Sequence, residues 1–194
     1  FGPYRKGAKS YKAHKATIAT LCQAMLERHR CQVEYQSPQR SSPSHFTLDP
    51  YRMFEFQGGL YVFAYVPGHD SVITLAVERI KELTATNDPF TVIEGFSFEA
   101  MRDRAFGVTA ETPMSVVIRF SSAVAPYIRE RIWHPTQQLT ELRNGNLTLR
   151  FRAGGALEIT RWVLSWGRYA TVLQPKVLRQ QIAEQLQAAA HLYR

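Results

Sequence analysis

The stretch GGLYVFAY, residues 58–65, limits the possible folds more than any other part of the sequence. At the two-residue period of a β-strand, one face carries three aliphatic residues and the other carries Tyr61, Phe63 and Tyr65. A strand with one face in solvent alternates apolar with polar residues, so this strand needs a cover, or a binding partner, for its aromatic face. The Gly-Gly pair in front of it suits the positive φ angles of a tight hairpin turn.

The neighbouring segments predict a helix and more short strands. Residues 14–29 place apolar residues at the spacing of an amphipathic helix. Strand patterns follow at 31–37, 45–48, 52–57 and 71–80, separated by turn signals at Asp49-Pro50 and Pro67-Gly68. Together with 60–66, which follows the Gly58-Gly59 turn, they make five short strands. This number suggests a small twisted barrel, whose closure removes exposed strand edges. Residues 84–96 read as a linker.

The second half of the chain has a different rhythm. After a short helix near residues 98–107, the predicted order from residue 115 is β-α-β-β-α-β-α. Its hairpin is marked by Asn144-Gly145, its first helix runs over 126–133, and Pro175 opens the last helix. This order is ferredoxin-like, βαββαβ, with one helix added at the C-terminal end. The predicted fold class is therefore α+β, a small β-barrel followed by a ferredoxin-like domain.

The charge of the chain favours an anionic partner. The net charge is +8 and the isoelectric point is about 9.7, which is typical of proteins that bind nucleic acid or nucleotides. Five basic residues precede the first acid, Glu27; they are Arg5, Lys6, Lys9, Lys12 and Lys15. This basic arm is either a solvated segment or a phosphate-contacting one. No apolar run has the length of a transmembrane helix, so no membrane association is expected.

Signatures of catalysis are absent from the sequence, and no enzyme activity is expected. There is no P-loop, no G-x-S-x-G, no G-x-G-x-x-G and no H-E-x-x-H motif. The six histidines are scattered without ligand spacing, so neither a metal nor another cofactor is expected. Cys22 and Cys31 form no disulfide framework and read as buried thiols in a reducing compartment, which favours the cytoplasm.

A binding constellation is better supported. Aromatic, hydroxyl and cationic side chains fall at or near the predicted strand ends, and stacked bases and phosphates need this mixture. The candidate ligand-binding residues are Tyr35, Ser37, His45, Arg52, Tyr61, Tyr65 and Arg79. The alternative is that Tyr61 and Tyr65 pack under the second domain or a dimer mate, with their hydroxyl groups at the rim.

The order of several motifs resembles the WYL domain. VEYQS, then LDPYRMFEFQGGLYVFAY, then ITLAVERIKEL follow that family's pattern, and RIWHPTQ, the RNG hairpin and WVLSWG resemble its C-terminal extension. The resemblance implies an Sm/SH3-like barrel over 30–86 and the extension over 115–194. A basic arm and linker helix, 1–29, would precede the barrel, and a linker with a short helix, 87–114, would join the two domains.

The resemblance also implies a role in transcription. WYL domains commonly follow a winged helix-turn-helix in bacterial regulators, are thought to sense single-stranded nucleic acid or nucleotides, and often form dimers. The chain begins Phe1-Gly2-Pro3 and contains no DNA-reading segment, so it is expected to be the sensing and dimerising part of such a regulator. Promoter DNA would then be contacted through a missing N-terminal domain.

The sequence departs from the family pattern at the name-giving triplet and at the basic residues. The triplet reads Leu60-Tyr61-Val62, and positions where relatives carry arginine hold Phe46, Ile73 and Ala76. Of the family's basic set Arg79 remains, and His45, Arg40 and Arg52 are the candidates that substitute for the rest. Two other functions stay open: a stand-alone nucleic-acid-binding accessory protein, for example one associated with phage defence, and a purely structural dimerisation module.

Overall fold

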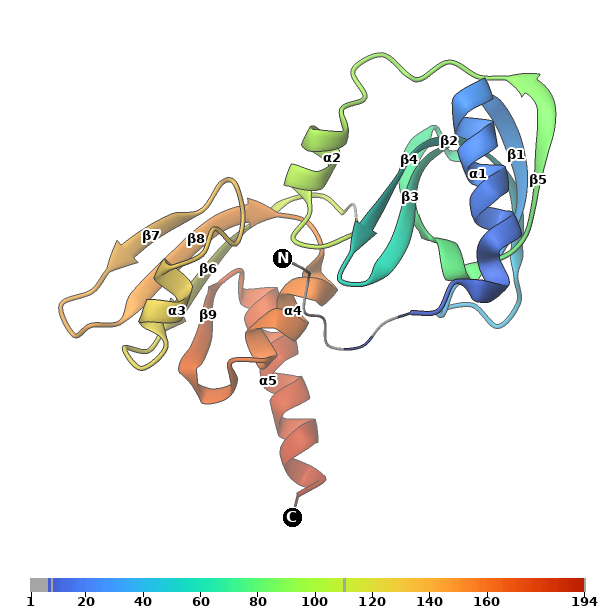
Figure 1. Cartoon of the computed structure of the whole chain (residues 1–194). Coiled ribbons are helices and arrows are strands. Elements are labelled where there is room, and N and C mark those ends of the chain that lie inside the picture. Colours follow the sequence, from blue (N-terminus) through green and yellow to red (C-terminus); the bar gives the residue numbers. More distant parts are fainter. Residues whose placement is uncertain (1–6, 8, 110, 194) are drawn as a thin grey trace. The chain divides into compact units, whose positions relative to one another are not determined.

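The chain folds into two units, residues 1–96 and 97–194. The computed structural model describes residues 7, 9–109 and 111–193 of the 194 in the sequence (Figure 1). Arg5 and Lys6 of the basic arm lie outside the described residues. Each unit contains one antiparallel sheet with helices packed on it, so the predicted α+β class is confirmed. None of the described helices is both long enough and apolar enough to span a membrane.

The first unit is a five-stranded antiparallel sheet beside one long helix. In chain order its elements are η1 (Lys12–His14), α1 (Lys15–Glu27), β1 (His29–Tyr35), β2 (Ser44–Phe56), β3 (Gly59–Val66), η2 (Pro67–His69), β4 (Ser71–Ala76), η3 (Val77–Arg79) and β5 (Ile80–Pro89). The strands lie in the order β4-β3-β2-β1-β5. No described ladder joins β4 to β5, so closure into an Sm/SH3-like barrel stays a prediction.

The core of this unit forms where the predicted apolar faces meet. Cys31, Val33 and Tyr35 of β1 alternate with exposed or half-exposed residues and point inward. Leu21 and Ala24 of α1 are fully buried against the same cluster. The helix ends at Arg28, whose φ of 56° is left-handed and whose N–H bonds to the Ala24 carbonyl. The helix and first strand are thus fixed by complementary apolar stripes.

Several predicted boundaries in this unit are wrong. The segments on either side of Asp49-Pro50 form the single strand β2, because Pro50 lies at a register shift in the β2–β3 ladder, a place where its missing N–H is tolerated. The turn before β3 uses Gln57 and Gly58, with φ of 49° and 82°, and Gly59 is already in the strand. Residues 71–80 are broken by η3, and β5 runs to Pro89 through part of the predicted linker because it continues to pair with β1.

The second unit has the ferredoxin-like order. Its elements are α2 (Phe98–Arg104), β6 (Met114–Phe120), α3 (Ala125–Arg129), β7 (Gln138–Glu141), β8 (Leu147–Ala153), α4 (Ala156–Leu164), η4 (Gly167–Tyr169), β9 (Ala170–Gln174) and α5 (Lys176–His191). The sheet order β7-β8-β6-β9 places the first and third strands in the centre, as in the split βαβ pattern. The helix predicted over 126–133 is shorter than expected, because the segment that follows α3 turns so that the Trp133 and His134 N–H groups donate to Oε1 of Gln137.

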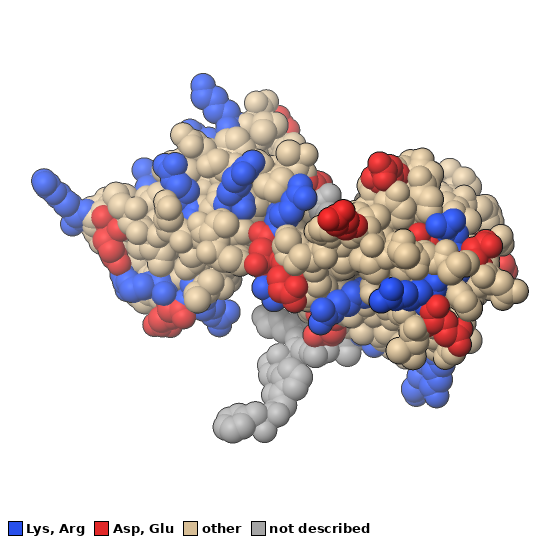
Figure 2. Space-filling model, turned by 90° about the horizontal axis from the view of Figure 1, so that it is seen from above, with Lys and Arg blue, Asp and Glu red and all other residues tan. Residues whose placement is uncertain are grey.

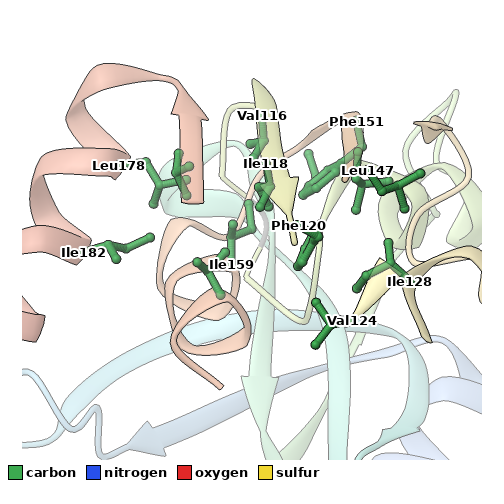
Figure 3. Packing of buried hydrophobic residues seen from close by; sticks show 14 of the residues in the cluster. Val116, Ile118, Phe120, Val124, Ile128, Leu147, Phe151, Ile159, Leu178 and Ile182 are labelled. Atoms are coloured by element: carbon green, nitrogen blue, oxygen red, sulfur yellow. The ribbon is translucent and has the colours of Figure 1, made fainter. Parts of the chain in front are cut away.

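One face of this second sheet carries the core. Val116, Ile118 and Phe120 of β6 are fully buried and point toward residues of α3, α4 and α5, as Figure 3 shows. Trp133, Trp162 and Trp166 are half-buried and pack at the margin of the same cluster. All three helices therefore cover one face of the sheet, and the other face carries none of them.

Candidate functional site

Four of the predicted ligand-binding residues, Tyr35, Ser37, Arg40 and Arg79, lie around the end of β1. The Gln36 N–H donates to the Arg79 carbonyl at 3.0 Å, which joins η3 to the loop after β1. The Gln36 side-chain amide donates to the carbonyl oxygens of Ser37 at 3.1 Å and of Arg40 at 2.7 Å. Gln36 therefore fixes Ser37, Arg40 and Arg79 in one rim, which we call the β1 rim.

The polar groups of the β1 rim differ in exposure. Arg40 and Arg79 are exposed, and Nη1 of Arg40 donates to the Ser44 hydroxyl at 2.9 Å. Ser37 is half-buried and donates to Oε1 of Gln39 at 2.6 Å. Tyr35 is buried, and its hydroxyl accepts a hydrogen bond from the Ala76 N–H at 3.2 Å. Tyr35 thus supports the rim from inside, while the two arginines present their guanidinium groups outward.

His45 lies on another surface, the outer face of the sheet. In the register its neighbour on β1 is Glu34, which in turn faces Glu82 of β5. These residues, with Thr47 and Thr84, line a shallow hollow of about 300 Å³. Two carboxylates in the hollow disfavour an anion there. The structure therefore does not place His45 with the β1 rim.

Tyr61 is half-buried under the basic arm. The ammonium of Lys9 lies 5.4 Å from the Tyr61 ring centroid and forms an ion pair with Glu78. The Tyr11 hydroxyl donates to Glu78 at 3.2 Å and accepts from the Leu60 N–H at 2.5 Å. Gly59 permits this close approach, since a Cβ there would lie 2.9 Å from the Tyr61 ring. Neither Lys9 nor Tyr11 was among the predicted ligand-binding residues. The only sequence feature that indicated a role for this segment was its run of basic residues.

The contacts of Glu78 change its acidity. Burial alone raises the pKa of this carboxyl group, but hydrogen bonds from Lys9, from the backbone and from Tyr11 outweigh burial and lower its pKa. For Lys9 the directions are reversed. Burial lowers the pKa of the ammonium, but the hydrogen bond to Glu78 and the charges around it outweigh burial, so its pKa is raised. Both groups are therefore charged near neutral pH, and the arm is held by a charged contact beside Tyr61.

Tyr65 lies at the opposite end of β3 and has a separate environment. Its hydroxyl donates to Asp70 at 2.6 Å, and this hydrogen bond raises the pKa of Tyr65. Its ring stacks on Tyr51 at 6.3 Å between centroids. Arg52 faces Phe63 in the β2–β3 register and is exposed. Tyr65 and Arg52 are therefore not gathered with the β1 rim.

The aromatic face of β3 is covered by aromatic residues of the same unit. Phe54 of β2 lies 4.6 Å from Phe63 and 5.7 Å from Tyr61 between ring centroids. Phe96 lies 4.8 Å from Tyr51 and 6.5 Å from Phe63. The sequence alternation predicted that this face needs a cover but did not identify Phe54, Tyr51 and Phe96 as the cover.

Groups that would indicate catalysis are sparse. The described residues contain no group of three or more His, Cys, Asp or Glu that could hold a metal ion. Burial raises the pKa of the Cys31 thiol to about 11, so it stays protonated and weakly nucleophilic near neutral pH. Cys22 is half-buried.

Among the solved structures that resemble the chain are the following two. One is the proteasome accessory factor B/C (PafBC) of Arthrobacter aurescens, with 21% identity, 97% coverage of this chain, 29% coverage of that chain and a TM-score of 0.43. The other is described as a CRISPR Cas-related protein, with 11% identity, 90% coverage of this chain, 50% coverage of that chain and a TM-score of 0.59. The chain thus spans at most half the length of either. Comparison with the curated proteins gives no match.

Two family models match the chain and together cover most of it. The WYL domain model matches residues 16–85, which include nearly all of α1 and the residues of the β1 rim. The WCX domain model matches residues 112–190, which include the whole ferredoxin-like sheet. The chain belongs to the WYL-domain proteins, with a WYL domain followed by a WCX domain.

Proposed function

We propose that the chain is the non-enzymatic sensing part of a bacterial WYL-family transcription regulator and that the β1 rim binds an anionic ligand, a nucleotide or single-stranded nucleic acid. One observation carries the proposal. Gln36 joins the loop of Ser37 and Arg40 to Arg79, although these residues are about 40 positions apart in the sequence. Gln36 thus holds the backbone of the two arginines at one place, and exposed arginines beside a hydroxyl suit a phosphate group, since arginine forms forked, charge-assisted hydrogen bonds with phosphate oxygens.

Tyr61 would supply a stacking surface only after the arm moves. Lys9 lies over its ring, so a base stacked there would replace one cation–π contact with an aromatic one. Binding at the rim that extends to Tyr61 would therefore compete with the arm. The arm precedes α1, and in a regulator it would lie on the side of the chain that leads to a DNA-binding domain. Ligand binding would then bias that domain between two arrangements through a difference in affinity.

The proposal includes a cytoplasmic homodimer that contacts promoter DNA through an attached domain. Exposed apolar residues in the WCX unit, Tyr127 at 61% and Ile132 at 84% exposure, offer surface for a second copy. Sedimentation velocity of the chain should give the mass of a dimer, and substitution of both residues by Ser should give the mass of a monomer. A wild-type chain sedimenting as a monomer at micromolar concentration contradicts this part.

The test of the ligand site is a binding titration. A 5′-phosphorylated single-stranded oligonucleotide and a mononucleotide are titrated into the chain at several salt concentrations. Arg40→Ala and Arg79→Ala should each weaken binding about tenfold, as for a lost charge-assisted contact, and should make it less sensitive to salt. Arg179→Ala, an exposed arginine on α5, is the matched control. No binding at low salt, or equal losses in all three variants, contradicts the site.

A purely structural dimerisation module is the second candidate. It is favoured by the internal contacts of the predicted tyrosines, since Tyr65 bonds to Asp70 and Tyr61 lies under Lys9. Both rings are only half-buried, whereas a purely structural role would favour full burial. A chain that dimerises and binds neither probe supports this candidate.

A further inference from the structure

The exposed residues on the face of the WCX sheet turned away from its core are basic and polar. The register places Ser115 of β6 beside Arg152 of β8, and Arg119 beside Thr148. On the other side Arg119 is beside Thr171 of β9. We call the outward side chains of the sheet the open face. Its named members are Ser115, Arg119, Thr148, Arg150, Arg152 and Thr171; Val117, opposite Arg150 in the register, is a buried apolar residue among them.

Three arginines on the open face are close neighbours. Arg150 and Arg152 are two residues apart on β8, so they point the same way about 7 Å apart. Arg119 faces Thr148, the residue before Arg150 on the same face, so Arg119 and Arg150 are diagonal neighbours about 7–8 Å apart. All three are exposed. Exposed guanidinium groups spread along a row in this way can contact several phosphates of one backbone.

The open face lacks the residues that would neutralise these arginines. The outward positions of β7 are Gln138 and Thr140, and no Asp or Glu lies at an outward position of the four strands. The acid of β7, Glu141, is paired in the register with inward-facing Leu147 and forms an ion pair with Arg129 of α3. None of the three arginines pairs with a described carboxylate.

The wider charge distribution agrees. Residues 97–194 contain 13 Lys and Arg against 7 Asp and Glu, which accounts for +6 of the net charge of +8. Twelve of the 13 are arginine, the cation that suits phosphate oxygens. In Figure 2 this unit, on the left, shows a group of Lys and Arg side chains along its upper side with few acidic ones among them.

From this charge, spacing and exposure we infer that the open face binds the phosphate backbone of duplex DNA, independently of sequence. No aromatic side chain lies at an outward position of the four strands, so the face cannot stack unpaired bases, which is how single strands are usually held. A duplex keeps its bases stacked inside and presents its phosphate backbone to a flat sheet. The open face is thus a second nucleic-acid surface, separate from the β1 rim of the WYL unit.

The test measures binding of a 30-base-pair duplex of arbitrary sequence to the full chain by fluorescence anisotropy from 50 to 200 mM salt. Three neutralised phosphates predict a slope of about −2.7 in log affinity against log salt, or a loss of about 40-fold across this range. The triple variant Arg119→Gln, Arg150→Gln, Arg152→Gln should bind at least about tenfold more weakly at 50 mM salt and lose most of that slope.

A control variant removes the same charge from the helices of the same unit. Arg161→Gln, Lys176→Gln, Arg179→Gln changes three exposed cations on α4 and α5 and should keep the slope. Equal losses in the two triple variants would show general charge attraction and overturn the inference. Preference for a single strand or for polyglutamate over the duplex would overturn it as well. Arg40→Ala should leave duplex binding unchanged, so the two surfaces are tested separately.

Discussion

The two sheets of the molecule treat their outward faces in opposite ways. In the WYL unit, the aromatic face of β3 is covered by Phe54 and Phe96, and the Tyr65 hydroxyl has a hydrogen-bond partner, Asp70, in the same unit. In the WCX unit, three helices cover one face, and the other presents Arg119, Arg150 and Arg152 without a described carboxylate partner. The difference shows that apolar sequence on a strand demands a cover from the same chain, whereas exposed arginines leave room for an external anion.

A core substitution tests whether the two sheets belong to independent folding units. Phe120→Ala removes a fully buried ring 5.7 Å from Trp162 and 5.9 Å from Trp166 between centroids. The free energy of unfolding of the WCX unit should fall by about 3–5 kcal/mol. Because all three tryptophans lie at 133, 162 and 166, denaturation followed by tryptophan fluorescence reports this unit alone.

Hydrogen exchange supplies the comparison for Phe120→Ala. Peptides from β1 and β2 of the WYL unit should exchange as in the wild type. If they lose protection together with β6 and β8, the two sheets unfold as one cooperative unit and the comparison fails.

The ion pair between Arg30 and Asp49 tests whether a buried polar group of the WYL unit depends on a partner from the same unit. Asp49 is 2% exposed and is held by two hydrogen bonds, 2.7 Å from Arg30 Nε and 3.0 Å from Nη2. Arg30→Ala leaves this carboxylate buried without its cation and should lower the free energy of unfolding of the unit by about 2 kcal/mol. Hydrogen exchange of β1 and β5 peptides measures the effect.

The double variant Arg30→Met, Asp49→Asn is the control for this pair. It removes both charges, so it should recover part of the stability that Arg30→Ala loses. A double variant less stable than Arg30→Ala would mean that the ionic contact itself, and not the orphaned carboxylate, sets the effect.

His134 makes the WCX unit sensitive to acid. Burial lowers its pKa, although the backbone and charge of Asp103 partly oppose the shift. Since the unfolded chain then binds the proton more readily, stability is fully present above about pH 6.5 and falls as the pH drops toward the folded pKa. The slope should be at most about 1.4 kcal/mol per pH unit. Tryptophan-detected denaturation at pH 5 to 8 measures it, and His134→Gln should flatten the dependence.

Loss of the contact between Lys9 of the basic arm and Glu78 should have the smallest effect on stability. This variant separates a structural role of the arm from a regulatory one. Lys9 has a side chain 41% exposed, so Lys9→Ala should change the free energy of unfolding by less than about 1 kcal/mol. It should instead speed hydrogen exchange in residues 9–14 and strengthen binding of the single-stranded probe by uncovering Tyr61. Unchanged probe binding would show that the arm does not compete with the ligand.

Sequence patterns predicted the elements better than the site. Helix 14–29, the alternation of β1 and the Asn144-Gly145 turn follow from local periodicity and backbone preference, and the structure confirms all three. The single strand β2 was missed because a Pro normally ends a strand, and only the β3 ladder shows that Pro50 falls at a register shift. Among the predicted site residues, Ser37, Arg40 and Arg79 are brought together, whereas His45 and Tyr65 lie on other surfaces.

The sequence by itself determined the two-domain α+β organisation, the WYL and WCX identity and the need to cover Tyr61, Phe63 and Tyr65. These features depend on strand and helix periods and on the order of motifs, which can be read from short stretches of the chain. Only the tertiary structure decided which residues provide that cover, that Gln36 fixes the β1 rim, and that Arg119 and Arg150 share the open face. Those facts depend on strand register, which pairs residues far apart in the chain and assigns each side chain to one face.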